Sequence, residues 1–283
     1  MLVEDTMFGV RDKIKISIDR LQALEPEEGY YVCFSGGKDS QCIKHLCDEA
    51  GVKYDYHYNI TGIDPPELIY FMRENYKDLE WHMYIKSMFK LIEDRGLPTR
   101  LKRICCAELK EQGGEGRLCI TGVRWAESTK RKGRRPFEVL TPKTEDKKLF
   151  NDNEADRRLF ENCLQKGKRI INPIIDWTDE DVWEYLNSRN IPHCKLYDEG
   201  QKRIGCIGCP LSSSQKEELA RYPKFRDNYY RAIEKFLPKY LERCRIKNRK
   251  PFLTTAKDWM SWWIGDLKVT NEVSFLDDTD DEE

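Results

Sequence analysis

The stretch YYVCFSGGKDS, residues 30–40, constrains the fold of this chain more than any other feature. Its apolar first half is typical of a buried strand, two glycines follow, and the residues from Asp39 to Ala50 have the composition of a helix. Glycines allow a tight turn, and the first amides of a helix have no partners within the helix. With the positive end of the helix dipole, these amides favour phosphate binding. The stretch therefore predicts a strand, a phosphate-binding turn and a helix, without the spacing of a Walker loop.

Short apolar runs alternate with helical patterns along the first 175 residues. Strands are expected at residues 52–60, 81–85 and 117–123, and a further apolar run occupies residues 170–175. Helices are expected at residues 6–24, 65–76, 87–94 and 103–112. Alternation at these lengths is typical of βαβ units and predicts an α/β fold, in which helices cover both faces of a parallel sheet.

The chain changes character after residue 140. Residues 141–169 are dominated by charged and amide side chains, so we expect an exposed, mobile excursion there. From residue 178 the pattern is mainly helical, with helices expected at 178–188, 214–221, 223–248 and 255–265. We interpret Trp259, Trp262 and Trp263 as core residues rather than as a stacking surface for bases. The acidic residues 277–283 are expected to form a disordered tail.

Charge and hydropathy exclude some functions. The formal net charge is −1 over 283 residues, which argues against a uniformly basic nucleic-acid-binding protein but leaves local basic clusters open. No apolar run approaches the roughly 18–20 residues of a transmembrane helix. Residues 1–5, MLVED, lack the pattern of a signal peptide. We therefore expect a cytoplasmic protein that does not interact with membranes.

Eleven cysteines in such a chain need an explanation, because a reducing compartment does not favour a disulfide framework. Five of them stand singly in apolar or helical surroundings and are expected to be small buried hydrophobic residues: Cys33, Cys42, Cys47, Cys119 and Cys163.

Two other groups of cysteines are spaced as metal ligands. Cys105 and Cys106 are adjacent, and Cys206 and Cys209 form a C-x-x-C pair next to glycines. Four thiolates suit either a structural zinc or a [4Fe–4S] cluster, and their spacing alone does not choose between the two. Adjacent cysteines are unusual as zinc ligands, and their presence therefore favours an iron–sulfur cluster.

The sequence SGGKDS at residues 35–40 resembles the pyrophosphate loop of the adenine nucleotide α-hydrolase superfamily, which includes ATP pyrophosphatases and the phosphoadenylyl-sulfate reductases. The resemblance spans roughly residues 30–212 and implies a Rossmann-like, HUP-type fold that holds an adenine nucleotide by its α-phosphate. A Cys-Cys pair followed at long range by C-x-x-C is similar to the iron–sulfur pattern of assimilatory adenylyl-sulfate reductases. It implies a [4Fe–4S] cluster on Cys105, Cys106, Cys206 and Cys209, with Cys194 as an alternative to Cys105.

The same resemblance implies roles for single residues. Candidate catalytic residues are Lys38, Asp39 and Arg124, and Arg124 follows the strand at 117–123, where functional residues collect in open sheets. Candidate residues for ATP and Mg²⁺, or for a sulfonucleotide, are Ser35, Gly36, Gly37, Asp39, Ser40, Thr61, Asp64, Gly122 and Arg124. The segment at Thr61 and Asp64 matches the family imperfectly, and helix capping explains Asp64 equally well. Lys130, Arg131, Arg134 and Arg135 fit a solvated loop or an anion site equally.

We expect three regions. Residues 1–177 form the nucleotide-binding α/β domain, residues 178–276 form a mainly helical region that carries the C-x-x-C pair, and residues 277–283 form the acidic tail.

Three functions remain open. Sulfonucleotide reductases use a nucleophilic cysteine in a Glu-Cys-Gly-x-His setting, whereas the last cysteine here, Cys244, lacks that setting. The first hypothesis is therefore an ATP pyrophosphatase that acts in sulfur transfer, with nucleic acid as an acceptor and a partner such as a cysteine desulfurase as donor. The alternatives are a divergent reductase of adenylyl sulfate or its 3′-phosphate, and a non-catalytic nucleotide-binding subunit.

Overall fold

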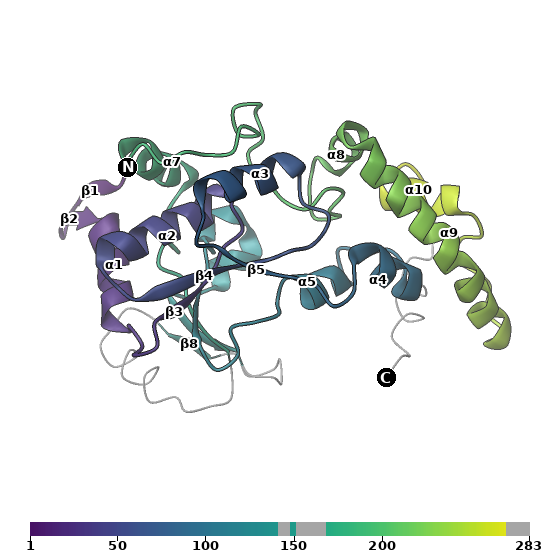
Figure 1. Cartoon of the computed structure of the whole chain (residues 1–283), viewed down its shortest axis with the longest axis horizontal. Helices are drawn as coiled ribbons and strands as arrows, with labels where there is room; N and C mark the ends of the chain where they lie inside the picture. Colours follow the sequence, from purple (N-terminus) through teal and green to yellow (C-terminus); the bar gives the residue numbers. More distant parts are fainter. Residues whose placement is uncertain (141–147, 151–167, 270–283) are drawn as a thin grey trace. The chain divides into compact units, whose positions relative to one another are not determined.

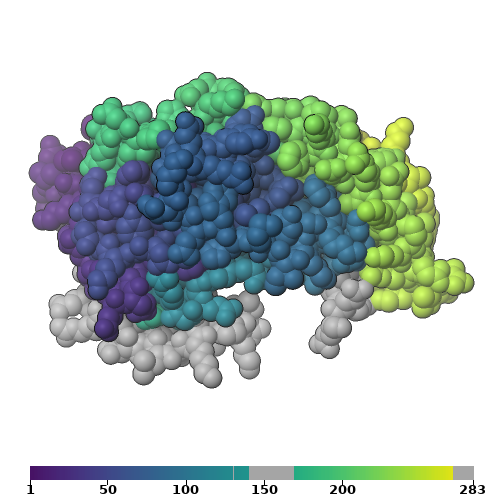
Figure 2. Space-filling model, in the orientation of Figure 1, coloured from purple at the N-terminus to yellow at the C-terminus, as the bar shows by residue number. Residues whose placement is uncertain are grey.

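The computed structural model of the chain describes residues 1–140, 148–150 and 168–269. The chain divides into two compact units, each of which draws on three segments. The first unit comprises Met1–Tyr58, Pro66–His82 and Gly113–Ile204, and the second comprises Asn59–Pro65, Met83–Gln112 and Gly205–Glu283. Figure 2 shows the light green and yellow residues of the second unit's later helices gathered at one part of the surface. The domain boundary expected at residues 177 and 178 stays a prediction.

A sheet that has seven strands in the described residues organises the first unit, in the order β5-β4-β3-β6-β9-β7-β8. The strands are β3 (Tyr30–Cys33), β4 (Tyr54–Asn59), β5 (Glu80–His82), β6 (Leu118–Ile120), β7 (Phe137–Leu140), β8 (Lys148–Phe150) and β9 (Lys168–Ile171). β3 pairs in parallel with β4 and β6, and β6 pairs in parallel with β9. The predicted α/β fold with a parallel sheet is confirmed. The antiparallel pairing of β7 with β9 and β8 is an addition that the sequence did not indicate.

Helix α2 (Lys38–Ala50) joins the glycine turn to the core of the first unit. It packs against β3 and against the helices α1 (Lys13–Ala23) and α7 (Asp179–Ser188), which lie beside it in Figure 1. Its buried face carries Cys42, Ile43 and Leu46, and the left-handed Gly51 ends it. The chain then enters β4 and the helix α3 (Pro66–Asn75). The start of α2 is therefore held by the packed core.

The first residues of the chain depart from the prediction of a helix over residues 6–24. Residues before Lys13 form a hairpin of β1 (Val3–Thr6) and β2 (Gly9–Asp12), in which Thr6 Oγ1 donates to the carbonyl of Gly9 at 2.7 Å. The helical prediction is wrong for residues 6–12 because Phe8 and Val10 were counted as core positions. Their side chains are 94% and 69% exposed, and Asp12 caps α1 by accepting from the amides of Ile14 and Lys15.

The second unit is helical, as the sequence predicts for the region after residue 205. Its helices are α4 (Met88–Arg95), α5 (Ile104–Leu109), α8 (Gln215–Arg221), α9 (Pro223–Ile246) and α10 (Ala256–Trp263). The long α9 packs against α4, α8 and α10 around an aromatic core. Trp259 and Trp263 are buried in that core, as predicted, and Trp262 is partly buried against it. None of the described helices is long and apolar enough to cross a membrane.

Some predictions fall outside the described residues. Of the excursion expected at 141–169, residues 148–150 form β8 and residues 168–169 belong to β9, while 141–147 and 151–167 lie outside. The acidic tail at 277–283 and Cys163 also lie outside. Of the other single cysteines, Cys42, Cys47 and Cys119 are buried as expected, and Cys33 is half-buried.

A buried ion pair anchors α1 to α7 and supplies a first prediction. Lys13 Nζ lies 2.8 Å from Asp181 Oδ2, with side-chain exposures of 4% and 0%. Because removing one partner of such a pair leaves a buried charge uncompensated, Asp181→Asn should lower the free energy of unfolding by about 3 kcal/mol. Urea denaturation measures the change. The exposed variant Asp48→Asn is the control and should change stability by less than about 0.5 kcal/mol.

The same pair sets a dependence of stability on pH. Burial would raise the pKa of Asp181, but hydrogen bonds from Lys13, the Thr178 amide and the N-terminal amino group, with the charge of Lys13, together lower it from 3.8 to about 2. A carboxyl with a depressed folded-state pKa stabilises the protein above its ordinary pKa, and this contribution disappears as the pH falls toward 2. Stability should therefore fall more steeply between about pH 4 and 2 in the wild type than in Asp181→Asn. Equal slopes would contradict this assignment.

Candidate functional site

The glycine turn after β3 is shaped by contacts that leave no room for side chains. Gly36 has a φ of +71°, and a Cβ there would lie 2.5 Å from Sδ of Met72, on α3. Glycine is the residue that accepts both the left-handed backbone and this close approach. Gly122, just beyond β6, is also tightly placed, since its Cβ would lie 3.1 Å from Cβ of Asp39. Gly36 thus allows the turn to approach α3, and Gly122 allows the end of β6 to approach the start of α2.

Hydrogen bonds fix the turn and the first residues of α2. Ser40 Oγ donates to the carbonyl of Gly37 at 2.9 Å and accepts from the amide of Ser35 at 3.2 Å. The amide of Lys38 donates to the hydroxyl of Tyr197 at 3.0 Å. Gly37 is the N-cap residue and has no side chain to cap the helix. The turn therefore presents the amide-rich start of a helix, the kind of site that binds phosphate.

Two carboxylates and two buried cations lie beside this turn. Arg124, whose side chain is 1% exposed, donates from Nε to Asp39 Oδ1 and from Nη2 to Asp179 Oδ1, at 2.7 Å each. Lys38, also buried, places Nζ 3.3 Å from Asp179 Oδ1 and 3.7 Å from Asp39 Oδ2. The three predicted catalytic residues thus meet, and Asp179 at the start of α7 joins them. Arg124 is enclosed by carboxylates rather than directed at an open phosphate site.

The charges of this group keep Asp179 ionised. Burial alone would raise the pKa of its carboxyl, but the hydrogen bond from Arg124 and the charges of Lys38 and Arg124 lower it below 3.8. The side chain of Asp179 is 60% exposed and that of Asp39 is 23% exposed. The Asp179 carboxylate therefore carries negative charge at neutral pH. The carboxylates of Asp39 and Asp179 are within reach of solvent, whereas Lys38 and Arg124 are buried.

A second set of arginines crowds positive charge in the same unit. Burial, followed by the positive charges of Arg203 and Arg134, lowers the pKa of Arg131 to about 10. Arg131 pairs with Glu127, and Arg134 Nε lies 2.7 Å from Glu138 Oε1. Arg131 and Arg134 thus already have carboxylate partners, and whether these arginines bind an anion stays a prediction.

The four cysteines predicted as metal ligands belong to the second unit. Cys105 and Cys106 lie on α5, and Cys206 and Cys209 lie in the segment before α8. All four are half-buried. The hydrogen bond with Cys106 and burial raise the pKa of Cys105, and the charges of Cys106, Cys206 and Cys209 add to the shift, so the four thiols interact electrostatically. Half-buried thiols in one group suit metal ligation better than isolated buried ones do. We name this set the cysteine quartet.

The two halves of the quartet have different acidities. A hydrogen bond from the Cys105 thiol lowers the pKa of Cys106, and Arg103 adds to the effect, so Cys106 ionises first of the two. Burial raises the pKa of Cys206 to about 12, with Lys110 opposing the shift. Burial would lower the pKa of Lys110, but the charges of Cys206 and Asp64 raise it instead. Lys110 therefore stays cationic beside the thiols and favours their thiolate forms.

Thr61 and Asp64 belong to the second unit, whereas the other predicted nucleotide ligands belong to the first. Thr61 Oγ1 donates to Asp64 Oδ2 at 2.5 Å and accepts from the amide of Ile63 at 3.1 Å. Asp64 Oδ1 lies 4.0 Å from Lys110 Nζ. These contacts associate Asp64 with the quartet's lysine, and its role toward a nucleotide stays a prediction. Cys194 belongs to the first unit and is fully buried.

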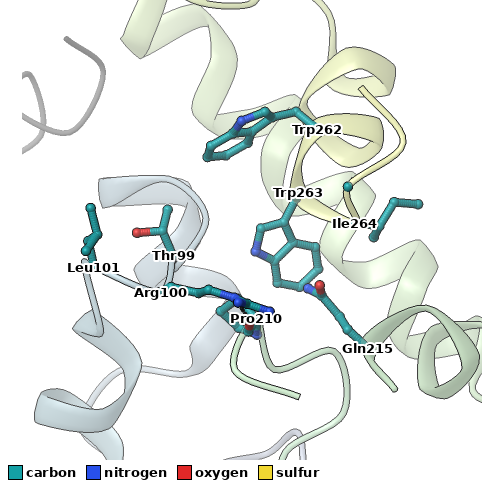
Figure 3. Close-up of a pocket in the computed structure, with 9 residues that line it drawn as sticks. Thr99, Arg100, Leu101, Pro210, Gln215, Trp262, Trp263 and Ile264 are labelled. Atoms are coloured by element: carbon teal, nitrogen blue, oxygen red, sulfur yellow. Dashed lines mark hydrogen bonds between the residues drawn. The ribbon is translucent and has the colours of Figure 1, made fainter. Parts of the chain in front are cut away.

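A cavity of about 350 Å³ lies in the second unit (Figure 3). Trp262 and Trp263 at the end of α10 face Thr99 and Arg100 across it, and Arg100 Nε donates to the carbonyl of Pro210 at 2.9 Å. Its lining includes none of the site residues predicted from the sequence. The chemistry of the chain is therefore better sought in the glycine turn and the quartet than in this cavity.

Sequence reasoning missed Asp179, Tyr197 and Lys110. Asp179 stands in the acidic first turn of a helix, where a carboxylate is the ordinary residue, so nothing in the sequence separates it from a capping residue. Tyr197 and Lys110 act through contacts with residues far away in the chain. A sequence signal for them would have required the tertiary fold.

Comparison with known proteins places the chain in a family. Residues 29–212 match the phosphoadenosine phosphosulfate reductase domain. One uncharacterized protein of Methanocaldococcus jannaschii is 25% identical over 257 residues, which cover 80% of this chain and 57% of the relative. A second uncharacterized protein of the same organism is 27% identical over 228 residues, which cover 74% of this chain and 42% of the relative. This chain thus spans about half the length of these curated relatives. Adenosine 5′-phosphosulfate reductase of Oceanobacillus iheyensis is 44% identical over 60 residues, 21% of this chain and 25% of that protein.

Solved structures give more distant similarities. FMN adenylyltransferase of Candida glabrata, in complex with FMN and an ATP analog, is 15% identical with a TM-score of 0.44, covering 69% of this chain and 61% of that one. Phosphoadenylyl-sulfate reductase of Candida auris is 17% identical with a TM-score of 0.40, covering 67% and 93%. The domain match itself begins just before β3 and ends after Cys209, and this chain accordingly belongs to the phosphoadenosine phosphosulfate reductase domain family.

Proposed function

We propose that this chain is an ATP pyrophosphatase, which cleaves ATP to AMP and pyrophosphate and acts in sulfur transfer. The observation that carries the proposal is the pair of carboxyl groups, Asp39 and Asp179, held beside the glycine turn by hydrogen bonds from Arg124. A turn that binds only an anion is weakened by two negative charges at its edge. Carboxylates become favourable when the ligand brings a divalent cation, as ATP does with Mg²⁺.

The residues of the site would have separate roles toward the phosphates and the metal ion. The backbone of the turn at Gly36 and Gly37, with Ser35 and Ser40, would hold the pyrophosphate portion of the nucleotide. The buried Lys38 would balance the negative charge of the pyrophosphate portion. Asp39 and Asp179 would hold Mg²⁺, which when bound neutralises charge on the phosphate oxygens.

Arg124 has a positioning role in this scheme, because its guanidinium contacts both carboxylates and is almost entirely buried. Gly122 allows the close approach to Asp39 that this arrangement needs. The arginines at positions 131, 134 and 203 would contact the departing pyrophosphate or a polyanionic acceptor.

The proposed reaction has two displacements. An oxygen of the acceptor attacks the α-phosphorus with a lone pair, and the bond from phosphorus to the bridging oxygen breaks as pyrophosphate leaves. A sulfur nucleophile at the oxidation level of sulfide then attacks the activated position and displaces AMP, which carries away the acceptor's oxygen. A partner such as a cysteine desulfurase would supply the sulfur as a persulfide, and a dithiol reductant would provide the two electrons that bring it to the level of sulfide, itself becoming a disulfide. We propose nucleic acid as the acceptor, since the exposed Lys132 and Arg203 lie near Arg131.

The cysteine quartet fits a [4Fe–4S] cluster in its donor set, with four thiols in one unit and the cationic Lys110 beside them. Adjacent cysteines such as Cys105 and Cys106 are unusual as zinc ligands, which supports iron over zinc. The bound cluster would supply a place to hold or relay sulfur, or structural support.

The partial similarity to adenosine 5′-phosphosulfate reductase keeps sulfonucleotide reduction as the second candidate. That reaction needs a nucleophilic thiol that reaches the substrate. Outside the quartet, the described cysteines are buried except for the half-buried Cys33, and Cys244 is 4% exposed on α9. The described cysteines therefore favour ATP cleavage over reduction.

The test is anaerobic purification of the full chain, followed by an assay of α-³²P-labelled ATP with Mg²⁺. We expect release of AMP, and a loss of about 100-fold in rate for Asp39→Asn, because the metal-binding carboxylates act on the transition state. Asp48→Asn, on the exposed side of the same helix, is the matched control and should keep the wild-type rate.

Two other outcomes are informative. Sulfite release from adenylyl sulfate with ATP left intact would refute the proposal in favour of reduction. Tight ATP binding without turnover of either nucleotide would point to a non-catalytic subunit.

A further inference from the structure

A histidine pair and a glutamate, none of them used above, meet on two neighbouring strands of the first unit. His57 Nδ1 lies 2.9 Å from His82 Nε2 and 3.3 Å from Glu80 Oε2. His57 is on β4, and Glu80 and His82 are two residues apart on β5, so they share a face of that strand. In the described part of the chain, these are the only three potential ligand atoms from histidine, cysteine or carboxylate that lie within 4.8 Å of one another.

The tautomer of His57 follows from its other neighbour. His57 Nε2 contacts Asp55 Oδ2, and a carboxylate only accepts hydrogen bonds, so Nε2 must carry the proton. In neutral His57 the lone pair is then on Nδ1, the atom that faces His82 and Glu80. This arrangement, with a carboxylate behind the imidazole, is how proteins orient metal-binding histidines.

Further contacts hold His57 in place. Arg117 donates to both carboxylate oxygens of Asp55, from Nη1 at 2.6 Å and from Nη2. Tyr31 stacks on the His57 ring with centroids 3.8 Å apart and planes 4° from parallel. His57 is only 6% exposed, whereas the Glu80 side chain is 57% exposed. The buried imidazole is therefore fixed, and the other two ligands are open to an arriving ion.

We propose that His57, Glu80 and His82 form a binding site for a divalent transition-metal ion, with Zn²⁺ as the ion that the ligand set fits best. Two imidazole nitrogens and one carboxylate oxygen, with a fourth position for water, are a common zinc ligand set. Tetrahedral ligands about 2.0–2.1 Å from zinc lie about 3.4 Å from each other. The separations of 2.9 and 3.3 Å around His57 Nδ1 are close to that value.

Binding requires little rearrangement. In the state without an ion, the N–H group at Nε2 of His82 donates a hydrogen bond to His57 Nδ1. When the ion binds, neutral His82 carries that proton on its own Nδ1 instead, so both histidines present lone pairs and no proton leaves the protein. The ion would tie the three-residue strand β5, which ends the sheet, to its neighbour β4.

The test uses the small number of histidines. The chain has four, so the ring signals in ¹H–¹³C NMR of the full chain can be followed singly during a Zn²⁺ titration. We expect two of the four to shift and to saturate at one equivalent. Zinc bound by the cysteine quartet moves no imidazole, so the readout is specific and does not depend on ATP cleavage. The melting temperature should rise with Zn²⁺ in parallel.

Variants assign the signals. His82→Ala changes an exposed residue and should abolish saturation at one equivalent, and Glu80→Gln should weaken binding at least 10-fold. His45→Ala, which removes a histidine of α2, is the matched control and should leave the two shifts unchanged. The proposal is wrong if one equivalent of Zn²⁺ shifts none of the four signals or shifts all of them alike. It is also wrong if Glu80→Gln and His82→Ala both bind with wild-type affinity.

Discussion

Arg124→Ala should reduce ATP cleavage at least 100-fold and lower the free energy of unfolding by about 3 kcal/mol. The guanidinium contacts Asp39 and Asp179 at 2.7 Å each and is 1% exposed. Its removal leaves two carboxylates facing each other across the space of a buried side chain, so one turns away or takes up a proton. A metal site built from both carboxylates is then lost.

Activity and stability separate in two further variants. Arg124→Lys keeps the charge, but a single ammonium group cannot donate to both carboxylates with the geometry of a guanidinium. We expect it to recover most of the stability and little of the rate. The quadruple variant Lys38→Met, Arg124→Met, Asp39→Asn, Asp179→Asn removes the four charges together and should be stable but inactive.

The control for these measurements is Arg189→Ala, which removes an arginine of the first unit that pairs with Glu49 and stacks on Tyr185. Its rate of ATP cleavage should equal that of the wild type. If Arg124→Lys cleaved ATP at the full rate, the bridging geometry would not matter and Arg124 would be only a structural charge.

Local patterns predicted the turn well because its chemistry is local. The apolar β3, the two glycines and the start of α2 follow one another in the chain. The tight turn between strand and helix needs the left-handed backbone of Gly36, and a glycine at that place in the sequence indicates such a turn. The long amphipathic helices of the second unit were predictable for the same reason. Periodicity over many residues specifies which face is buried.

Relations between distant segments were not predictable in the same way. Asp179 looks like a helix start until the fold brings it to Arg124, and Thr61 and Asp64 fall in the unit of the cysteines. The spacing predicts a helix over residues 6–12 of the hairpin because apolar spacing does not reveal whether Phe8 has anything to pack against. His57 and His82 lie on separate strands and become neighbours only through the strand order of the sheet.

Cys106→Ser and Cys209→Ser should each remove nearly all iron and sulfide from the anaerobically purified protein. Serine nearly keeps the size of the side chain but is a poor ligand for iron, so a cluster that depends on four thiolates loses the protein ligand of one iron. Cys106 is the residue whose pKa is lowered by Cys105 and Arg103, and it should matter most at neutral pH. Iron and acid-labile sulfide per chain, with the visible absorption of the cluster, measure the result.

The matched pair of variants is Cys105→Ala and Cys194→Ala. Both remove one thiol, but Cys194 is fully buried in the first unit, whereas Cys105 is half-buried beside Cys106 on α5. We expect iron to be lost from Cys105→Ala and kept by Cys194→Ala. The opposite result would replace Cys105 by Cys194 in the ligand set.

Loss of the cluster should also destabilise the second unit, because a ligand that binds only the folded state adds its binding free energy to folding. The first unit has its own core and sheet, so its tryptophan and ion-pair contacts should persist. ATP binding by Cys209→Ser, measured by equilibrium dialysis, therefore distinguishes two roles for the cluster. Retained binding with lost sulfur transfer would assign the cluster to sulfur chemistry, whereas restored transfer in a zinc-loaded protein would assign it to structure.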